Sequence, residues 1–196
     1  MNRLLSHLFA GTALKQVPTG SRNFNLVPSP QNANILVVHE VNISRDAAPL
    51  YSIAVSQSTK PNISLHKGQV DPRTTIGTAT FHSFSSTTHM SLYGRSIPLK
   101  MNQLTGNFSL RGPPIGDMKW KYDDLTSRSL VMRDNLGNNL AKLKSIGFSG
   151  ERQLEILVPC DEFLVELMML SGIAAKIVSK KVNEAAAEVS SAVAVV

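Results

Sequence analysis

The sequence predicts a mainly β protein: a closed antiparallel β-barrel of about twelve strands that encloses a hydrophobic C-terminal α-helix. Three observations predict this fold class. Residues 163–178, FLVELMMLSGIAAKIV, form a helical segment that is apolar almost all round. About eleven short β-type segments, roughly ten residues apart, precede this helix. A closed barrel would bury the helix on every side and leave no sheet edge unpaired.

The composition is typical of one globular domain. The chain has 196 residues, of which 42% are hydrophobic and 6% aromatic, and a chain of this size can bury a core. A net charge of +6 and a pI near 9.6 favour anionic partners. Cys160 is the only cysteine, which excludes an internal disulfide and a cysteine-based zinc site. A reducing, intracellular location fits this cysteine content best.

Residues 1–33 differ from the rest of the chain. They are basic, since no acidic residue occurs before Glu40, and Leu5, Leu8 and Phe9 would share one face of a short helix. Two interpretations stay open. The segment is either a flexible basic extension outside the fold, or it carries a mitochondrial transit peptide in residues 1–22. The barrel is expected to span residues 34–181.

Strand-like segments rich in β-branched and alternating residues follow, and turn residues separate them. A proline within residues 96–101, Pro98, predicts an edge strand or a bulge there. The alternation is strictest in residues 117–123, 127–134 and 139–145. The other predicted strands are residues 35–43, 50–57, 63–67, 74–84, 89–94, 96–101, 107–112 and 153–159.

The helix is expected to cover about residues 160–181, with acidic residues in its first turn as the helix dipole prefers. Residues 182–196, rich in alanine and valine, form either a tail or a helix extension. The apolar segment 163–178 would be about 24 Å long, which is short of the ~30 Å hydrocarbon core of a bilayer. A buried helix is therefore preferred, and a single-pass membrane anchor is the alternative.

One group of charged residues has a predicted common location. Strand alternation directs five cations to one outer surface across three neighbouring strands: Lys119, Lys121, Arg133, Lys142 and Lys144. The expected pairing puts Lys121 near Ser129 and Lys142 near Val131. This surface is either a solvated basic face or a site for anionic lipid headgroups. Nucleic acid is disfavoured because this face lacks interleaved aromatic residues for base stacking.

No catalytic motif is present in the sequence. It contains no nucleophile elbow, phosphate-binding glycine loop or dinucleotide fingerprint. The five histidines lack the spacing of metal ligands, so no catalytic residue, metal site or cofactor is expected. An enzyme whose site is assembled from distant loops stays open as an alternative, because such a site leaves no local motif.

Two segments resemble the tubby C-terminal-like superfamily, which includes tubby-like proteins, LURP-one-related proteins and phospholipid scramblases. They are WKYDDLTSRSLVMRDNLGNNLAKLKS, beginning at Trp120, and QLEILVPCDEFLVELMMLSGIAAKIV, which leads into the helix. The resemblance covers residues 34–181 and is strongest to small fungal members. It implies a twelve-stranded barrel around a central helix, and it implies phosphoinositide or membrane association for the tubby branch.

The preferred functional hypothesis is a non-enzymatic, monomeric barrel that binds anionic phospholipids, such as phosphoinositides, or a protein partner at a membrane surface. Its expected location is cytoplasmic or on the membrane periphery. The alternative is a scramblase-like membrane protein that uses residues 163–178 as its span.

Overall fold

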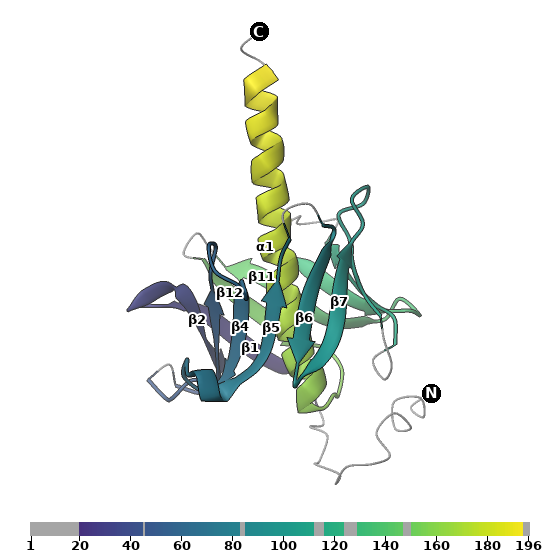
Figure 1. Cartoon of the computed structure of the whole chain (residues 1–196). Helices are drawn as coiled ribbons and strands as arrows, with labels where there is room; N and C mark the ends of the chain where they lie inside the picture. The colour runs from purple at the N-terminus through teal and green to yellow at the C-terminus, as the bar shows by residue number, and fades with distance from the viewer. Residues whose placement is uncertain are drawn as a thin grey trace.

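The computed structural model is a closed antiparallel barrel with one long helix running through it, as Figure 1 shows. It describes residues 20–44, 46–82, 85–111, 116–123, 129–146 and 150–193. Twelve strands and one short 3-10 helix lie within these residues, together with the long C-terminal helix. The predicted fold class is thereby confirmed.

The strands are short and follow one another along the chain. They are β1 (Arg22–Ser29), β2 (Asn32–Glu40), β3 (Tyr51–Val55), β4 (Ile63–Lys67), β5 (Thr75–Thr80), β6 (Thr87–Leu92), β7 (Arg95–Met101), β8 (Phe108–Leu110), β9 (Met118–Tyr122), β10 (Leu130–Asp134), β11 (Asn139–Ile146) and β12 (Glu151–Ile156). The 3-10 helix η1 (Pro72–Thr74) precedes β5, and α1 (Glu162–Val193) follows β12.

Each strand pairs with the next one along the chain, and β12 returns to pair with β1. The register of the closing pair runs from Arg22 opposite Ile156 to Leu26 opposite Arg152. The ring therefore has no free sheet edge, the usual reason for closing an antiparallel sheet. Pro98 lies in a part of β7 that pairs with β6 but is outside the register with β8.

Strand β1 corrects the predicted domain boundary. Its residues fall inside the segment 1–33 that was expected to lie outside the fold, so the barrel begins at Arg22 and not at residue 34. Phe24 and Leu26 are fully buried in the core, while Asn23 and Asn25, which alternate with them, are only partly buried. The predicted transit peptide falls mainly on residues 1–19, which lie outside the described residues.

Helix α1 fills the barrel lumen with its first half. Asp161 caps its N-terminus, since the Leu164 amide donates a hydrogen bond of 2.9 Å to Asp161 Oδ1. Nearly every side chain from Val165 to Ala175 is buried, including the polar Glu166 and Ser171. The segment proposed as a membrane span therefore lies inside the barrel.

The second half of α1 leaves the barrel and projects from it (Figure 1). Residues 180–187 are exposed. The helix runs to Val193, which extends the expected limit of residue 181 and agrees with the predicted helix extension. The molecule thus has two unlike ends: the helix N-terminus seals one, and the projecting helix passes through the other.

Two glycines allow the helix and wall to approach closely. A Cβ on Gly172 of α1 would lie 3.0 Å from Trp120 Cζ2 and 3.2 Å from Leu143 Cδ2. A Cβ on Gly77 of β5 would lie 3.0 Å from Leu92 Cδ1 and 3.1 Å from Leu170 Cδ2. Such distances are shorter than those of normal packing. The helix can lie this close to the barrel wall because neither glycine has a side chain.

Candidate functional site

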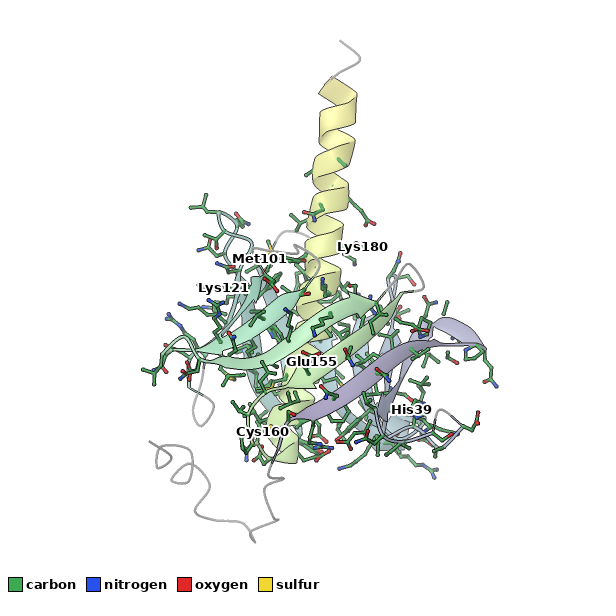
Figure 2. All side chains as sticks on the ribbon, turned by 180° about the vertical axis from the view of Figure 1, so that it is seen from behind. His39, Met101, Lys121, Glu155, Cys160 and Lys180 are labelled. Carbon is green, nitrogen blue, oxygen red and sulfur yellow. The ribbon has the colours of Figure 1, made fainter. Side chains whose placement is uncertain are left out.

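The five cations predicted to share a surface do lie on the outward positions of β9, β10 and β11. The inward positions of the same strands carry core residues such as Trp120, Met132 and Leu143. We call this surface the outer basic face, defined by Lys119, Lys121, Arg133, Lys142 and Lys144. In Figure 2, Lys121 lies toward the barrel end from which the helix projects, whereas Cys160 lies at the other end.

The pairing of residues across the strands that carry this face was predicted correctly in part. Val131 pairs with Lys142, as expected. Lys121 pairs with Val131 and not with Ser129, so that prediction was wrong by two residues. The Asp123 amide donates to the Ser129 carbonyl just beyond the ladder. A shift of two residues keeps side chains on the same face, so the common location survives the error.

Two of the five cations are neutralised by neighbouring carboxylates. Lys142 Nζ lies 2.7 Å from Asp123 Oδ2, and Lys144 Nζ forms an ion pair with Glu155. Neither acid was included when the face was predicted. Within the described part of the chain, no ion pair involves the other three cations of the face. The available positive charge is therefore concentrated on β9 and β10.

A small polar hollow lies beside these cations, with a volume of about 270 Å³. Lys121 and Arg133 line it from the strands, and Thr105 and Asn107 line it from the loop between β7 and β8. Arg133 Nε donates a hydrogen bond of 3.0 Å to Asn139 Oδ1, which orients the guanidinium. We call this the outer hollow. It combines two cations with a hydroxyl and an amide, the donors that bind phosphate oxygens.

Three further residues of this face were missed from the sequence. Lys100 lies in one row with Ser109, Lys119 and Arg133, because β7, β8, β9 and β10 are consecutive neighbours. Thr105 and Asn107 reach the outer hollow from a loop. Alternation alone directs Lys100 outward, but only the register of β8 places it beside the other cations.

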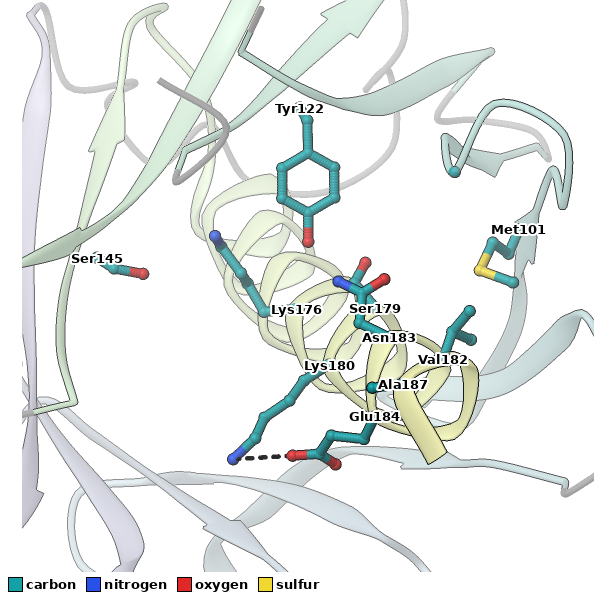
Figure 3. A pocket seen from close by; sticks show the side chains of 11 residues that line it. Met101, Tyr122, Ser145, Lys176, Ser179, Lys180, Val182, Asn183, Glu184 and Ala187 are labelled. Atoms are coloured by element: carbon teal, nitrogen blue, oxygen red, sulfur yellow. Dashed lines mark ion pairs between the residues drawn. The ribbon is translucent and has the colours of Figure 1, made fainter. Parts of the chain in front are cut away.

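A larger cavity of about 780 Å³ opens where α1 leaves the barrel (Figure 3). Its walls are mainly apolar, with Met101 and Tyr122 on the rim and Val182 on the helix. Lys176 and Lys180 of α1 also line it. We call this the mouth cavity. It shares Tyr122 with the outer hollow, so the two lie on either side of the same strand end.

The mouth cavity is lined by three charged residues, Lys176, Lys180 and Glu184, and Lys180 forms an ion pair with Glu184. Lys176 Nζ lies 5.2 Å from the centre of the Tyr122 ring. Burial lowers the pKa of Lys176, and the nearby positive charge of Arg152 lowers it further. Burial also lowers the pKa of Arg152. Two partly buried cations therefore repel each other at this end of the barrel.

The opposite end holds a buried polar cluster around the start of α1. Glu166 is fully buried, and its Oε1 accepts hydrogen bonds from Tyr93 at 3.1 Å and Tyr51 at 3.3 Å. Lys67 Nζ lies 3.8 Å from the same oxygen. Glu166 Oε2 has no hydrogen-bond partner among the described residues. Tyr51 also donates to Glu162, the first residue of the helix.

The two carboxyl groups of this cluster shift in opposite directions. Burial raises the pKa of Glu166, and the hydrogen bonds and Lys67 only partly offset this effect. Burial also acts on Glu162, but the Tyr51 hydrogen bond and the Arg22 charge outweigh it and lower the pKa of Glu162. The pKa of Tyr93 is raised to about 12, first by burial and then by its bond to Glu166. None of these residues lines the mouth cavity or the outer hollow.

Other kinds of site find no support in the described residues. They contain no group of three or more acidic, histidine or cysteine side chains able to hold a metal ion. Cys160 is buried, and burial raises the pKa of its thiol to about 11, so it stays protonated near neutral pH. None of the described helical residues forms a helix both long and apolar enough to cross a membrane.

No family model, curated protein or solved structure matches this chain. The resemblance to the tubby C-terminal-like superfamily stays a prediction, and the site must be interpreted from its own geometry.

Proposed function

We propose that this chain is a tubby-like, non-enzymatic barrel that binds anionic phospholipid headgroups, phosphoinositides among them, at a membrane surface. One observation carries the proposal: the outer hollow places Lys121 and Arg133 beside Thr105 and Asn107 in a space of about 270 Å³. A guanidinium offers a fork of donors that matches phosphate oxygens, and an ammonium adds a mobile point charge.

The neighbouring cations extend the same attraction beyond the hollow. Lys119 is opposite Arg133 in the register, and Lys100 lies in the same row. Cations near a charged bilayer contribute about 1 kcal/mol each, so a group of four supports peripheral binding. Lys142 and Lys144 add less, because their charge is already balanced by Asp123 and Glu155.

The test is co-sedimentation with phosphatidylcholine vesicles, with and without a phosphoinositide. The double variant Lys121→Glu, Arg133→Glu is expected to fold normally, because exposed charges add little to stability. Its binding should weaken more than about tenfold, since two attractive charges become repulsive. Wild-type binding should fall as salt rises from about 0.1 to 0.5 M, because salt shortens the screening length.

A matched control is available across the barrel. The double variant Lys60→Glu, Arg73→Glu changes the net charge equally, but these residues lie near β4, far from β10 in the strand order. The control should keep wild-type binding. Equal loss in both double variants would mean that only net charge matters. Such a result, or a wild-type protein that never sediments with the vesicles, contradicts the proposal.

A further inference from the structure

The loop between β7 and β8, residues 102–107, carries an unusually exposed apolar side chain. Leu104 is 97% exposed, more than any other large apolar side chain that the structure describes. The loop follows Met101, which Figure 2 places with Lys180 at the barrel end from which the helix projects. Single exposed leucines are common on protein surfaces, so the significance of this one depends on its surroundings.

Hydrogen bonds within the loop hold Leu104 in place. Asn102 Oδ1 accepts one from the Leu104 amide at 2.9 Å and one from the Thr105 amide at 3.1 Å. The Gly106 amide donates to the Asn102 carbonyl at 2.8 Å, and the Asn102 amide donates to the Asn107 carbonyl at 2.7 Å. The loop is therefore ordered before it meets a partner, and binding through it does not carry the cost of ordering it.

The same loop forms one wall of the outer hollow. Thr105 and Asn107, which follow Leu104 in the chain, line the hollow opposite its two cations. Residues 100–111, which include the end of β7, the loop and β8, contain no acidic residue. An exposed apolar group beside clustered cations matches an anionic bilayer, which attracts the charges and accepts the apolar group among its acyl chains.

A second exposed leucine lies in contrasting surroundings. Leu136 is 75% exposed in the turn between β10 and β11, and its amide donates to Asp134 Oδ1 at 2.9 Å. Strand β10 begins beside Tyr122, at the mouth cavity, and ends at Asp134, so this turn lies at the opposite end of the barrel. Both leucines lie in turns that a side-chain oxygen organises, but only Leu136 has a carboxylate beside it, which an anionic bilayer repels.

We propose that Leu104 inserts into the acyl region of an anionic bilayer while the outer hollow holds a lipid headgroup. This inference deepens the proposed function and rests on it, since membrane binding is its premise. Shallow insertion is sufficient, because peripheral proteins bury their apolar groups only about 5–10 Å into the boundary between headgroups and acyl chains. The loop at residues 102–107 then faces the bilayer, and the turn that carries Leu136 faces away from it.

Leu104→Ser tests the contribution of the leucine to binding of phosphatidylcholine vesicles that contain a phosphoinositide. Co-sedimentation should weaken about tenfold, because the burial of one leucine side chain is lost. The factor should be equal at about 0.1 and 0.2 M salt, since salt screens charges and not apolar contacts. Leu136→Ser is the matched control and should bind as wild type does. Wild-type binding by Leu104→Ser would refute the insertion.

Tryptophan reporters locate the inserted loop directly. Trp120 is the only tryptophan of the chain and is fully buried, so its emission should not respond to vesicles. Leu104→Trp should emit at shorter wavelength when vesicles are added, and phosphatidylcholine with brominated acyl chains should quench it. Leu136→Trp should show neither effect, and it controls for the affinity of tryptophan itself. Equal quenching of both variants would overturn the specific insertion of the Leu104 loop.

The outcomes separate this inference from the proposed function. If Leu104→Trp sediments with the vesicles and is not quenched, the insertion is refuted and the headgroup site stands. If Leu104→Ser loses binding while the double variant Lys121→Glu, Arg133→Glu keeps it, the headgroup site is refuted and the insertion stands. A wild-type protein that does not sediment with the vesicles contradicts both.

Discussion

The Trp120 indole donates a hydrogen bond of 2.9 Å to Ser171 Oγ, and both side chains are completely buried. This bond joins the barrel wall to the central helix. Ser171→Ala would leave the indole N–H without its acceptor, which costs about 1–3 kcal/mol. The better helix propensity of alanine returns at most about 0.5 kcal/mol. We therefore expect a lower free energy of unfolding, measured by urea denaturation.

Asn183→Ala is the control for that measurement, because Asn183 is an exposed position on the same helix. It gains the helix propensity of alanine without losing a buried partner, so its stability should match or slightly exceed wild type. If Ser171→Ala were as stable as Asn183→Ala, the buried hydrogen bond would contribute nothing measurable.

Gly172→Ala should destabilise the fold although alanine is the better helix former. The new methyl group would meet the Trp120 ring at about 3.0 Å, and overpacking of this kind costs about 1–3 kcal/mol. The gain in helix propensity is only about 1 kcal/mol. A double-mutant cycle with Trp120→Leu checks the cause: in that background the cost of Gly172→Ala should shrink. An unchanged cost would point to another contact, such as Leu143.

The two halves of α1 should respond oppositely to a buried charge. Leu167 is fully buried, so Leu167→Asp would place a carboxylate in a dry interior at a cost of several kcal/mol. We expect insoluble or molten protein. Val182 is 45% exposed on the projecting part, and Val182→Asp should be tolerated. Soluble expression and a cooperative thermal transition distinguish them; a cooperatively folded Leu167→Asp monomer would contradict a helix enclosed by the barrel.

Truncation tests the new position of the first strand. A chain beginning at Gly20 retains every strand and should keep the wild-type urea midpoint. A chain beginning at Pro30 lacks Phe24 and Leu26 and leaves β2 and β12 with unpaired edges. We expect the shorter chain to aggregate. If it folded with an unchanged midpoint, β1 would be dispensable for closure.

Glu166→Gln should reveal the cost of a buried carboxylate through its pH dependence. A folded-state pKa raised above the ordinary 4.5 means that the folded protein holds this proton more tightly than the unfolded chain. The resulting stability is present below pH 4.5 and is lost as pH rises through the raised pKa. Glutamine does not titrate, so the variant should gain stability relative to wild type between pH 4 and pH 7.

That comparison is made by urea unfolding of both proteins at each pH. Groups common to both, including Glu162 with its lowered pKa, contribute alike and cancel to first order. The opposite trend, in which the variant loses relative stability with rising pH, would mean that Lys67 stabilises the ionised Glu166 by more than burial opposes it.

Alternation made the barrel predictable, because a half-buried strand must place every second side chain on the core. It served best in β9 and in the second part of β11, where MKWKY and AKLKS alternate strictly. Strand β1 carries the same pattern in Phe24 and Leu26, but its acid-free, proline-containing surroundings favoured a separate extension. The buried helix was predictable from a different pattern, because it lacks a polar face wide enough to lie against solvent.

The candidate site was less predictable, because its charge balance depends on contacts between distant segments. Glu155 neutralises Lys144 from the last strand, and Thr105 and Asn107 enter the outer hollow from a loop. Lys100 lies beside the other cations only because β8 pairs with both β7 and β9. Alternation gives the side of a strand on which a charge lies, and the register decides which charges meet.

The pairing of β1 with β12 has a consequence for synthesis on the ribosome. The first strand emerges early, yet its second partner and the helix that fills the lumen emerge last. Until then, the inner faces of eleven strands have no central helix to pack against, and β1 has an open edge. Closure brings together residues as distant as Arg22 and Ile156, a contact of high sequence separation that forms slowly. The growing chain is therefore expected to depend on chaperones that cover apolar surface until the helix is released.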